Sequence, residues 1–449
     1  SATIDSEKFS RAFAGAAVIE VSGRTYPVDV LYAPKEENSE LNYELSDPEA
    51  AVMAVMRLRQ EYRDGDILIF MATERDIRET CELLKGQLGR DSVILPLFAR
   101  LSWSEQRRIF QTFDAQKIIV ATNIAETSLT IPGIQYVIDP GTARISHYNS
   151  RTGTNSLPVR EISRSSADQR KGRCGRVAKG LCIRLYSEGE YSSRPLYTTP
   201  EIMRANLAGV LLQMLSLNLR DIASFPFIDH PTNRGIQDGL ETLWELRAIK
   251  RNPGKAGALE LRSIGRIMGR IPLDPRLAKM IIEANKEGCL KEMTIIAAAL
   301  SLPDPRERPA EKEEAADKAH ASFTDNSSDF LTLLNIWKGF QSLHAAKSSR
   351  TKVKKYCRDH FLSYRRMCEW QDVHEQIGQI LREEKFAMLL PPPISAAMGS
   401  KSSRLAKTLP HISNRRDWMM LPWFQAWMVP VRSTSSSDFS SSQSPSPRT

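Results

Sequence analysis

Four short apolar runs, set among segments of helical character, most restrict how this chain can fold. The runs occupy residues 67–71, 93–97, 117–122 and 136–139. Apolar residues at helical spacing and capping residues predict helices over 48–62, 74–84 and 102–113. Continuous apolar runs are typical of strands that are buried on both faces of a parallel sheet. This alternation predicts an α/β doubly wound domain with right-handed crossovers. Two further short strands are expected around a Gly-Arg turn within 17–32.

Two loops of the predicted domain are candidates for function. Ligands bind such sheets beyond the carboxyl ends of the strands, and loop 122–130 directly follows the strand expected at 117–121. The second candidate is the basic loop 169–176, which precedes another expected strand. Between the two loops, residues 143–159 alternate weakly in polarity and contain a glycine, so we expect a protruding hairpin there.

The basic loop reads Gln-Arg-Lys-Gly-Arg-Cys-Gly-Arg and places four cations within eight residues. Arginine suits phosphate because its planar fork donates two hydrogen bonds and keeps its charge at any working pH. The two glycines allow the backbone to approach a partner closely. This combination favours a polyanionic ligand, although a solvated basic surface or a nonspecific nucleic-acid patch has the same composition.

The overall charge agrees with a polyanionic partner. A formal net charge of +9 and a pI near 9.2 favour nucleic acid ahead of a membrane surface. No apolar run approaches the roughly 20 residues of a membrane span, and the first residues do not form a signal peptide. Because the sequence starts with Ser1 rather than Met, we expect it to begin inside a longer product. Its 449 residues allow roughly two to four domains.

Six cysteines are spread along the chain without a CxxC pair. This spacing fits reduced thiols in a cytoplasmic protein better than a disulfide framework or a zinc site, so we expect no metal centre. Cys174 lies among the arginines of the basic loop, where its pKa could be lowered. The alternative for Cys174 is a small residue that fills a tight loop.

The sequence around the two candidate loops resembles the DEAH-box ATP-dependent RNA helicases. Ala-Thr-Asn-Ile-Ala-Glu-Thr-Ser-Leu-Thr-Ile at 121–131, followed by Tyr-Val-Ile-Asp-Pro-Gly at 136–141, is similar to their motif V. Residues 169–176 are similar to motif VI, 67–70 to motif IV, and the opening Ser-Ala-Thr to motif III. Both the residues of these motifs and the spacing between them match the family.

Finer details resemble the bacterial HrpA type more than the eukaryotic splicing type. These details are Lys171, Cys174 and the Val-Ala-Lys-Gly that follows the basic loop. The resemblance extends over about residues 1–385 and implies the C-terminal portion of such a helicase, from motif III onward. It implies that 1–190 form the second RecA-like helicase domain, preceded by the motif III end of the first.

The region after the RecA-like domain indicates a winged-helix module over 191–270. Its signals are helices expected at 204–219 and 236–246, a strand at 259–261 and a turn from Gly265 to Gly269. A winged helix can read DNA, but the resemblance implies that it braces the RecA-like domain.

The remaining chain is expected to divide into a helical part and a tail. Residues 271–385 are expected to be all-helical and resemble the ratchet-like bundle that lines the RNA channel of the family. Within them, 347–366 mix basic and aromatic side chains, which suits single-stranded RNA or a solvated helix face. Residues 386–416 contain no acidic residue and 433–449 are rich in serine, so we expect a disordered or frame-shifted tail over 386–449.

The resemblance implies a nucleotide site between two RecA-like domains. Gln169, Arg173 and Arg176 would reach the γ-phosphate of ATP, the two arginines acting as fingers that stabilise charge developing during phosphoryl transfer. Phe110 would stack on adenine, and Thr130 would belong to the same site. On pattern alone, Phe110 is equally an ordinary core aromatic.

The resemblance also implies RNA contacts by Thr122, Asn123 and Arg144, and a wedge between RNA strands formed by hairpin 143–159. Pro132 departs from the family, because many members have an aspartate there that touches the ribose. This departure puts the ribose contact in doubt and fits loose nucleotide selectivity.

The sequence contains neither a GxxxxGK[ST] P-loop nor an Asp-Glu-Ala-His box. The phosphate cradle and the Mg²⁺-binding carboxylate would therefore come from the first RecA-like domain of the same full-length protein. We predict that these 449 residues alone hydrolyse ATP negligibly. The full-length product would be a monomeric, cytoplasmic helicase acting on RNA with a single-stranded 3′ tail or on an RNA duplex. The alternative is a non-catalytic RNA-binding or regulatory module; a winged-helix transcription factor would leave the two loops unused.

Overall fold

The computed structural model describes most of the chain up to residue 386. The described residues are 5–19, 26–35, 37–38, 43–62, 64–89, 91–127, 129–149, 152–219, 224–251, 259–309, 312–345 and 349–386. The residues similar to motif III and the predicted tail beyond 386 lie outside these ranges.

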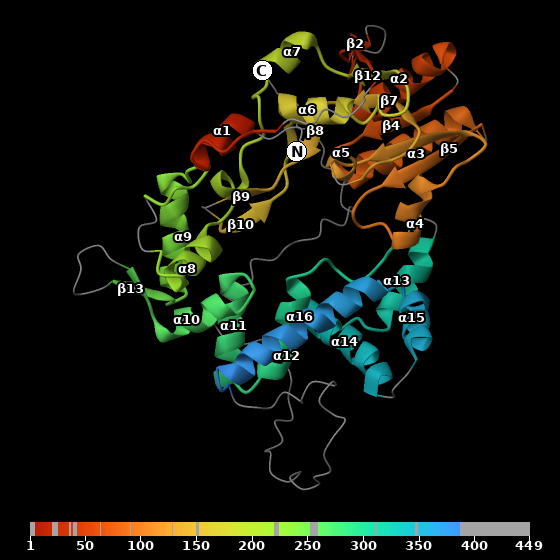
Figure 1. The fold of residues 1–449 in the computed structure, drawn as a ribbon. Coiled ribbons are helices and arrows are strands. Elements are labelled where there is room, and N and C mark those ends of the chain that lie inside the picture. The colour runs from red at the N-terminus through yellow and green to blue at the C-terminus, as the bar shows by residue number, and fades with distance from the viewer. Residues whose placement is uncertain are drawn as a thin grey trace, which may run out of the picture. The chain divides into compact units, whose positions relative to one another are not determined.

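Six parallel strands form the central sheet, which is drawn in red, orange and yellow-green in Figure 1. The strands are β1 (Val28–Tyr32), β4 (Asp66–Phe70), β5 (Ser92–Leu97), β6 (Gln116–Ala121), β7 (Ile134–Asp139) and β12 (Gly180–Arg184). Their order is β1-β12-β7-β4-β6-β5, and every neighbouring pair is parallel. The predicted parallel α/β domain is therefore confirmed.

Both faces of this sheet are covered, as the continuous apolar runs predicted. Ile67 and Ile69 of β4 point to the face covered by α2 (Asp47–Glu61) and α3 (Glu74–Leu88). Leu68 and Phe70 point to the opposite face, where η1 (Arg108–Phe110) and α5 (Ile124–Thr127) contribute to the core. Alternate residues of one strand thus enter two separate cores.

The helix starts follow from local capping chemistry. The N-caps of α2 and α3 are Ser46 and Thr73, and each forms a reciprocal capping box with an acid three residues later. Ser102 does the same with Glu105, as the sequence predicted. The helix expected over 102–113 is nevertheless shorter. It comprises α4 (Trp103–Arg107), which buries no side chain, and then the 3₁₀ turn η1.

Of the two short strands predicted within 17–32, the second is confirmed as β1. Residues 17–19 form no strand, and 20–25 lie outside the described residues. β1 is an edge strand of the main sheet, parallel to β12. Its partner lies some 150 residues later in the chain, so the local pattern around the Gly-Arg turn could not reveal the pairing.

The protruding hairpin between the two candidate loops is confirmed. β8 (Thr142–Arg144) pairs with β11 (Val159–Glu161), and β9 (His147–Asn149) pairs with β10 (Thr154–Ser156), both antiparallel. Smaller elements complete this part of the chain: α1 (Ser6–Ala12), β2 (Glu37–Asn38), β3 (Tyr43–Glu44), α7 (Glu188–Ser193) and η2 (Glu201–Met203).

Three helices and a two-stranded hairpin follow the domain built on the parallel sheet. They are α8 (Ala208–Ser216), α9 (Asn233–Glu245), β13 (Ile249–Arg251), β14 (Leu259–Leu261) and α10 (Ser263–Arg270). The winged-helix assignment stays a prediction, but the expected turn from Gly265 to Gly269 is wrong. Both glycines lie inside α10, where a Cβ atom at Gly265 would stand 2.1 Å from the carbonyl oxygen of Ala248. They permit close helix packing rather than a turn.

The all-helical stretch predicted from residue 271 is confirmed up to residue 383. Its helices are α11 (Pro275–Lys286), α12 (Leu290–Leu300), α13 (Glu313–Ala321), α14 (Asp329–Ala345), α15 (Arg350–Asp359) and α16 (Tyr364–Glu383). In Figure 1, α16 runs beside α12 and α14. Trp370 of α16 is buried there, and its indole N–H donates to the carbonyl oxygen of Ile295 at 2.9 Å. Within the described part of the chain, we find no helix with the length and apolar character that crossing a membrane requires.

Candidate functional site

The basic loop begins later than the sequence predicted. Gln169 and Lys171 lie in the last turn of α6 (Arg164–Lys171), and only residues 172–176 form a turn toward β12. Gly175 has a φ of +78°, and a Cβ atom there would stand 2.4 Å from a methyl group of Val28. Glycine is therefore required, and it allows this turn to pack closely against the start of β1.

Two arginines of this turn contact the loop between α5 and β7. Arg173 donates from Nη1 to the carbonyl oxygen of Leu129 at 2.9 Å, and Arg176 donates from Nη1 to Thr130 Oγ1 at 2.9 Å. The structure thus brings together three predicted site residues, Arg173, Arg176 and Thr130. Burial lowers the pKa of Arg173, and the neighbouring Arg176 charge lowers it further. Among the described residues, the buried Nε of Arg173 has no hydrogen-bond partner.

The predicted site residues lie at opposite ends of the parallel strands. Thr122 and Asn123 directly follow the carboxyl end of β6, as expected, and the Thr122 N–H donates to the carbonyl oxygen of Leu97 at 3.1 Å. Arg173 and Arg176 instead lie on the turn that leads into the amino end of β12. The expectation that ligands bind beyond the carboxyl ends of the strands therefore holds for the positions of Thr122 and Asn123 but not for those of the two arginines.

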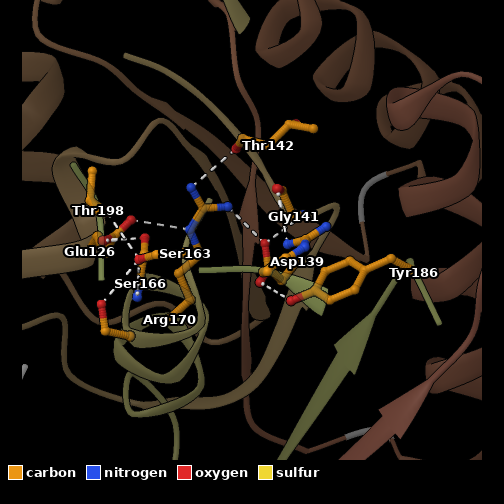
Figure 2. A network of polar contacts seen from close by, with 11 residues as sticks. Glu126, Asp139, Gly141, Thr142, Ser163, Ser166, Arg170, Tyr186 and Thr198 are labelled. Atoms are coloured by element: carbon orange, nitrogen blue, oxygen red, sulfur yellow. Dashed lines mark hydrogen bonds and ion pairs between the residues drawn. The ribbon is translucent and has the colours of Figure 1, made fainter. Parts of the chain in front are cut away.

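A third arginine, Arg170, occupies the centre of a buried polar network (Figure 2). Its side chain is 1% exposed and lies over the ring of Phe70, 4.6 Å from the centroid. Nη1 donates to Asp139 Oδ1 at 2.7 Å, Nε to Glu126 Oε2 at 3.2 Å, and Nη2 to the carbonyl oxygen of Thr142 at 3.1 Å. Burial alone lowers the pKa of Arg170, but the two carboxylates outweigh it and raise the pKa above its ordinary value.

The network joins the two candidate loops to the root of the hairpin. Ser166 of α6 donates to Glu126 at 2.6 Å, and the backbone N–H of Gly141 donates to Asp139 at 2.8 Å. Tyr186 donates its hydroxyl to the other oxygen of Asp139 at 3.1 Å. Burial and the Asp139 charge raise the pKa of Tyr186, so its phenol stays a donor. Sequence reasoning gave no role to Glu126 or Asp139; the one available signal was an aspartate that ends an apolar strand. It counted Arg170 among the cations for a polyanionic ligand, which is wrong, because this side chain is buried and paired within the protein.

The other predicted site residues are separate. Phe110 is 44% exposed at the end of η1, so it is not a core aromatic. Asn123 is exposed, and Arg144 is exposed on β8, opposite Val159 of the hairpin. In the part of the chain that the structure describes, no hydrogen bond or ion pair between side chains joins Arg144 to another predicted site residue.

Cys174 does not have the lowered pKa that its basic neighbours suggested. Its side chain is 1% exposed, its thiol donates to the carbonyl oxygen of Lys171 at 3.0 Å, and burial raises its pKa to about 12. Cys174 therefore fills a tight turn. All six cysteines are free thiols. The described residues include no group of three or more histidine, cysteine, aspartate or glutamate side chains that could hold a metal.

Comparison with known proteins agrees with this architecture. Residues 50–178 match the family of the helicase conserved C-terminal domain, which spans α2 to the turn after α6. Residues 274–333 match the helicase-associated domain (HA2), ratchet-like, which covers α11 to the start of α14.

Full-length relatives show the same relationship. The chain is 52% identical over 383 residues to the ATP-dependent RNA helicase HrpA of Escherichia coli, and 52% identical over 384 residues to its homolog in Haemophilus influenzae. It is 36% identical over 390 residues to the pre-mRNA-splicing factor ATP-dependent RNA helicase prp22 of Schizosaccharomyces pombe. These matches cover 85% of this chain but only 29% of each bacterial relative and 32% of prp22. The higher identity to HrpA confirms the bacterial resemblance: the chain belongs to the HrpA-type DEAH-box helicases, of which it spans the helicase C-terminal and ratchet-like region.

Proposed function

We propose that this chain forms the part of an ATP-dependent RNA helicase that completes the nucleotide site and guides RNA during unwinding. The observation that carries this proposal is the pair of guanidinium groups, Arg173 and Arg176, held beside each other on the loop of Leu129 and Thr130. Two adjacent cations are costly unless an anion joins them, and the triphosphate of ATP supplies that charge.

In this proposal ATP is the substrate, and its γ-phosphate meets Gln169, Arg173 and Arg176. Phe110, which is 44% exposed, provides a ring face for adenine, and Thr130 lies beside the phosphates. Mg²⁺ would be bound by the first RecA-like domain, since the P-loop and the DEAH box would both belong to that domain. The Arg170 network holds α6 firmly, so the two arginines after it need little reorganisation during phosphoryl transfer.

RNA would contact Thr122 and Asn123 beyond the carboxyl end of β6, and Arg144 on the hairpin. Arg170 ties these segments together, because it contacts both the α5 loop and the root of the hairpin. This connection would couple the state of the nucleotide to the hairpin that separates RNA strands. The alternative, a non-catalytic RNA-binding module, uses the same surfaces without turnover.

The test is RNA-stimulated ATP hydrolysis by the purified chain, with and without a separately supplied first RecA-like domain. We expect negligible activity alone, and activity on adding that domain. Arg173→Ala should then lower kcat by about 10³-fold or more, which is the range reported for arginine fingers. RNA affinity should stay unchanged, because Arg173 faces the nucleotide.

Lys250→Ala is the matched control, since Lys250 is an exposed cation of β13 paired only with Glu260. It should leave kcat unchanged. If the supplemented chain binds RNA but hydrolyses no ATP under any condition, the non-catalytic module is the better description. An Arg173→Ala variant as active as the control would remove the finger assignment.

A further inference from the structure

The element that carries Phe110 has little packing of its own. α4 buries none of its side chains, and η1 buries only Ile109. A short 3₁₀ turn of three residues has poor internal hydrogen bonding and rarely holds its shape alone. An exposed ring on such a turn can serve as a fixed stacking surface only if something else anchors the turn.

That anchor is a buried lysine on the neighbouring strand. Lys117 of β6 is 4% exposed, and its Nζ donates to the carbonyl oxygen of Ile109 at 3.0 Å, with the carbonyl oxygen of Gln111 at 3.4 Å. These two carbonyls flank Phe110 in the chain. The same ammonium reaches the carbonyl oxygen of Pro132 at 3.5 Å, in the loop that leads into β7. One cation therefore joins two segments that are about 20 residues apart in sequence.

Asp66 completes this arrangement. Its Oδ2 lies 3.2 Å from Lys117 Nζ, which neutralises the buried charge, and its Oδ1 accepts the backbone N–H of Lys117 at 3.0 Å. Its own N–H donates to the carbonyl oxygen of Gly133 at 3.1 Å. Gly133 has a φ of +86°, and a Cβ atom there would stand 2.5 Å from the Asp66 carboxylate. The Pro132–Gly133 turn is thus fixed against Asp66 from both sides.

We propose that Lys117 is a positioning residue for the side of the nucleotide site that receives the base: it fixes η1, and with it Phe110, against the loop of Thr130 to Gly133. The inference rests on the proposed function, and it identifies the residue that holds the base-binding side of the nucleotide site in place. A compact ammonium with three donors can serve carbonyls in several directions, whereas the planar fork of arginine cannot. Pro132 offers no side-chain hydrogen bond, so stacking on a fixed ring carries the recognition of a purine base.

The first experiment is hydrogen exchange on the whole 449-residue chain without nucleotide. Lys117→Met keeps the length of the side chain but removes all three donors. We expect amide exchange over 105–113 and 129–134 to accelerate by about 10-fold or more, since local opening no longer breaks these hydrogen bonds. Exchange in α6 should stay unchanged. Asp66→Asn, which keeps the shape but removes the charge and one of the two acceptor oxygens, should give a smaller acceleration of the same two segments.

If Lys117→Met does not fold, the Asp66→Asn comparison decides. Unchanged exchange in the two segments, or acceleration spread evenly over the domain, would overturn the proposal.

The second experiment asks whether the effect passes through Phe110. In the supplemented hydrolysis assay, Phe110→Ala and Lys117→Met should each raise KM for ATP by about 10-fold with kcat nearly kept. Arg173 and Arg176 contact the same loop, but the Arg170 network holds the helix that precedes them. The double variant should be no worse than either single one, since both changes remove one stacking surface. If Lys117 had only a general structural role, the effects of Lys117→Met and Phe110→Ala would add in the double variant, and kcat would fall as well. Additive effects would therefore overturn the proposal.

Failure of the proposed function gives a different result. If Phe110→Ala leaves KM unchanged while exchange still responds to Lys117→Met, then Phe110 does not receive the base, and Lys117 only holds η1 and the loop together.

Discussion

Three arginines within residues 170–176 have three different environments, and the environment sets the task of each. Arg170 is buried and paired with Asp139 and Glu126, so a ligand cannot reach it. Arg173 is half-buried with one unused donor, and Arg176 is exposed. A buried pair loses several kcal/mol when one partner is removed, so Arg170 acts on structure. The other two arginines can exchange their present contacts for a phosphate.

Thiol reactivity should follow burial rather than the basic neighbourhood. Burial raises the pKa of Cys174, Cys81 and Cys357 to about 12, and that of Cys289 to about 11. Almost no thiolate exists near pH 8, and thiolate is the reactive form. Cys368 is the one partly exposed cysteine. We expect an aromatic disulfide reagent at pH 8 to modify one thiol per native chain quickly, and all six after denaturation.

The Cys368→Ser variant provides the control, because it should abolish the fast reaction without changing the slow one. Rapid modification that persists in this variant would show that a cysteine of the core, Cys174 included, is accessible in solution.

At the level of elements, the glycines of α10 report close packing of this helix against its neighbours. A Cβ atom at Gly265 would meet the backbone carbonyl of Ala248 at 2.1 Å, and one at Gly269 would meet Ser216 Oγ at 2.4 Å. Gly265→Ala should therefore destabilise by about 1–3 kcal/mol through overpacking. Gly269→Ala should cost less, since the Ser216 side chain can rotate away. Urea unfolding followed by circular dichroism measures both.

Gly86→Ala on α3 is the matched control, because its Cβ atom would meet nothing within 4 Å. There alanine should stabilise by about 0.5–1 kcal/mol, the ordinary helix preference. If Gly265→Ala also stabilises, the close contact between α10 and Ala248 does not exist in solution.

The elements that could be predicted from sequence are those with a local cause. Ser46, Thr73 and Ser102 begin their helices because each cap bonds to a residue three positions later. Apolar runs likewise located β4 and β6. The pairing of β1 with β12 depends on distant residues, so the local pattern could not reveal it. The prediction of a turn from Gly265 to Gly269 failed for a related reason. The sequence shows that these two positions have no side chain, but it does not show which neighbour packs into the space.

The candidate site divides in the same way. The motif pattern located Arg173, Arg176 and Thr130, which the structure brings into contact. It could not locate Lys117, because a lysine at the start of an apolar run usually marks the solvent-exposed end of a strand. Its burial depends on three carbonyls and a carboxylate contributed by η1, the loop before β7 and β4. Such a residue becomes visible only when the whole domain is assembled.

At the scale of the whole molecule, exposed cations are concentrated on one helix of the described surface. α15 exposes five cations in ten residues, and its one acid, Asp359, lies 3.6 Å from Arg358. The aromatic residues nearby are engaged in packing: Tyr356 contacts His360, and Tyr364 lies 5.5 Å from Lys354 Nζ. This surface therefore suits an RNA backbone rather than stacked bases.

Removing three of these lysines tests whether their location matters beyond their charge. For a single-stranded RNA oligonucleotide, log Kd should depend linearly on log salt, with a slope of about 0.7 for each phosphate neutralised. The triple variant Lys352→Ala, Lys354→Ala, Lys355→Ala should lower that slope by up to about 2 units. The control triple, Lys250→Ala, Lys286→Ala, Lys291→Ala, makes the same change in net charge elsewhere on the exposed surface. This control triple should lower the slope much less.

Equal slopes for the two triple variants would mean that only the total charge of the chain attracts RNA. α15 would then be an ordinary solvated helix.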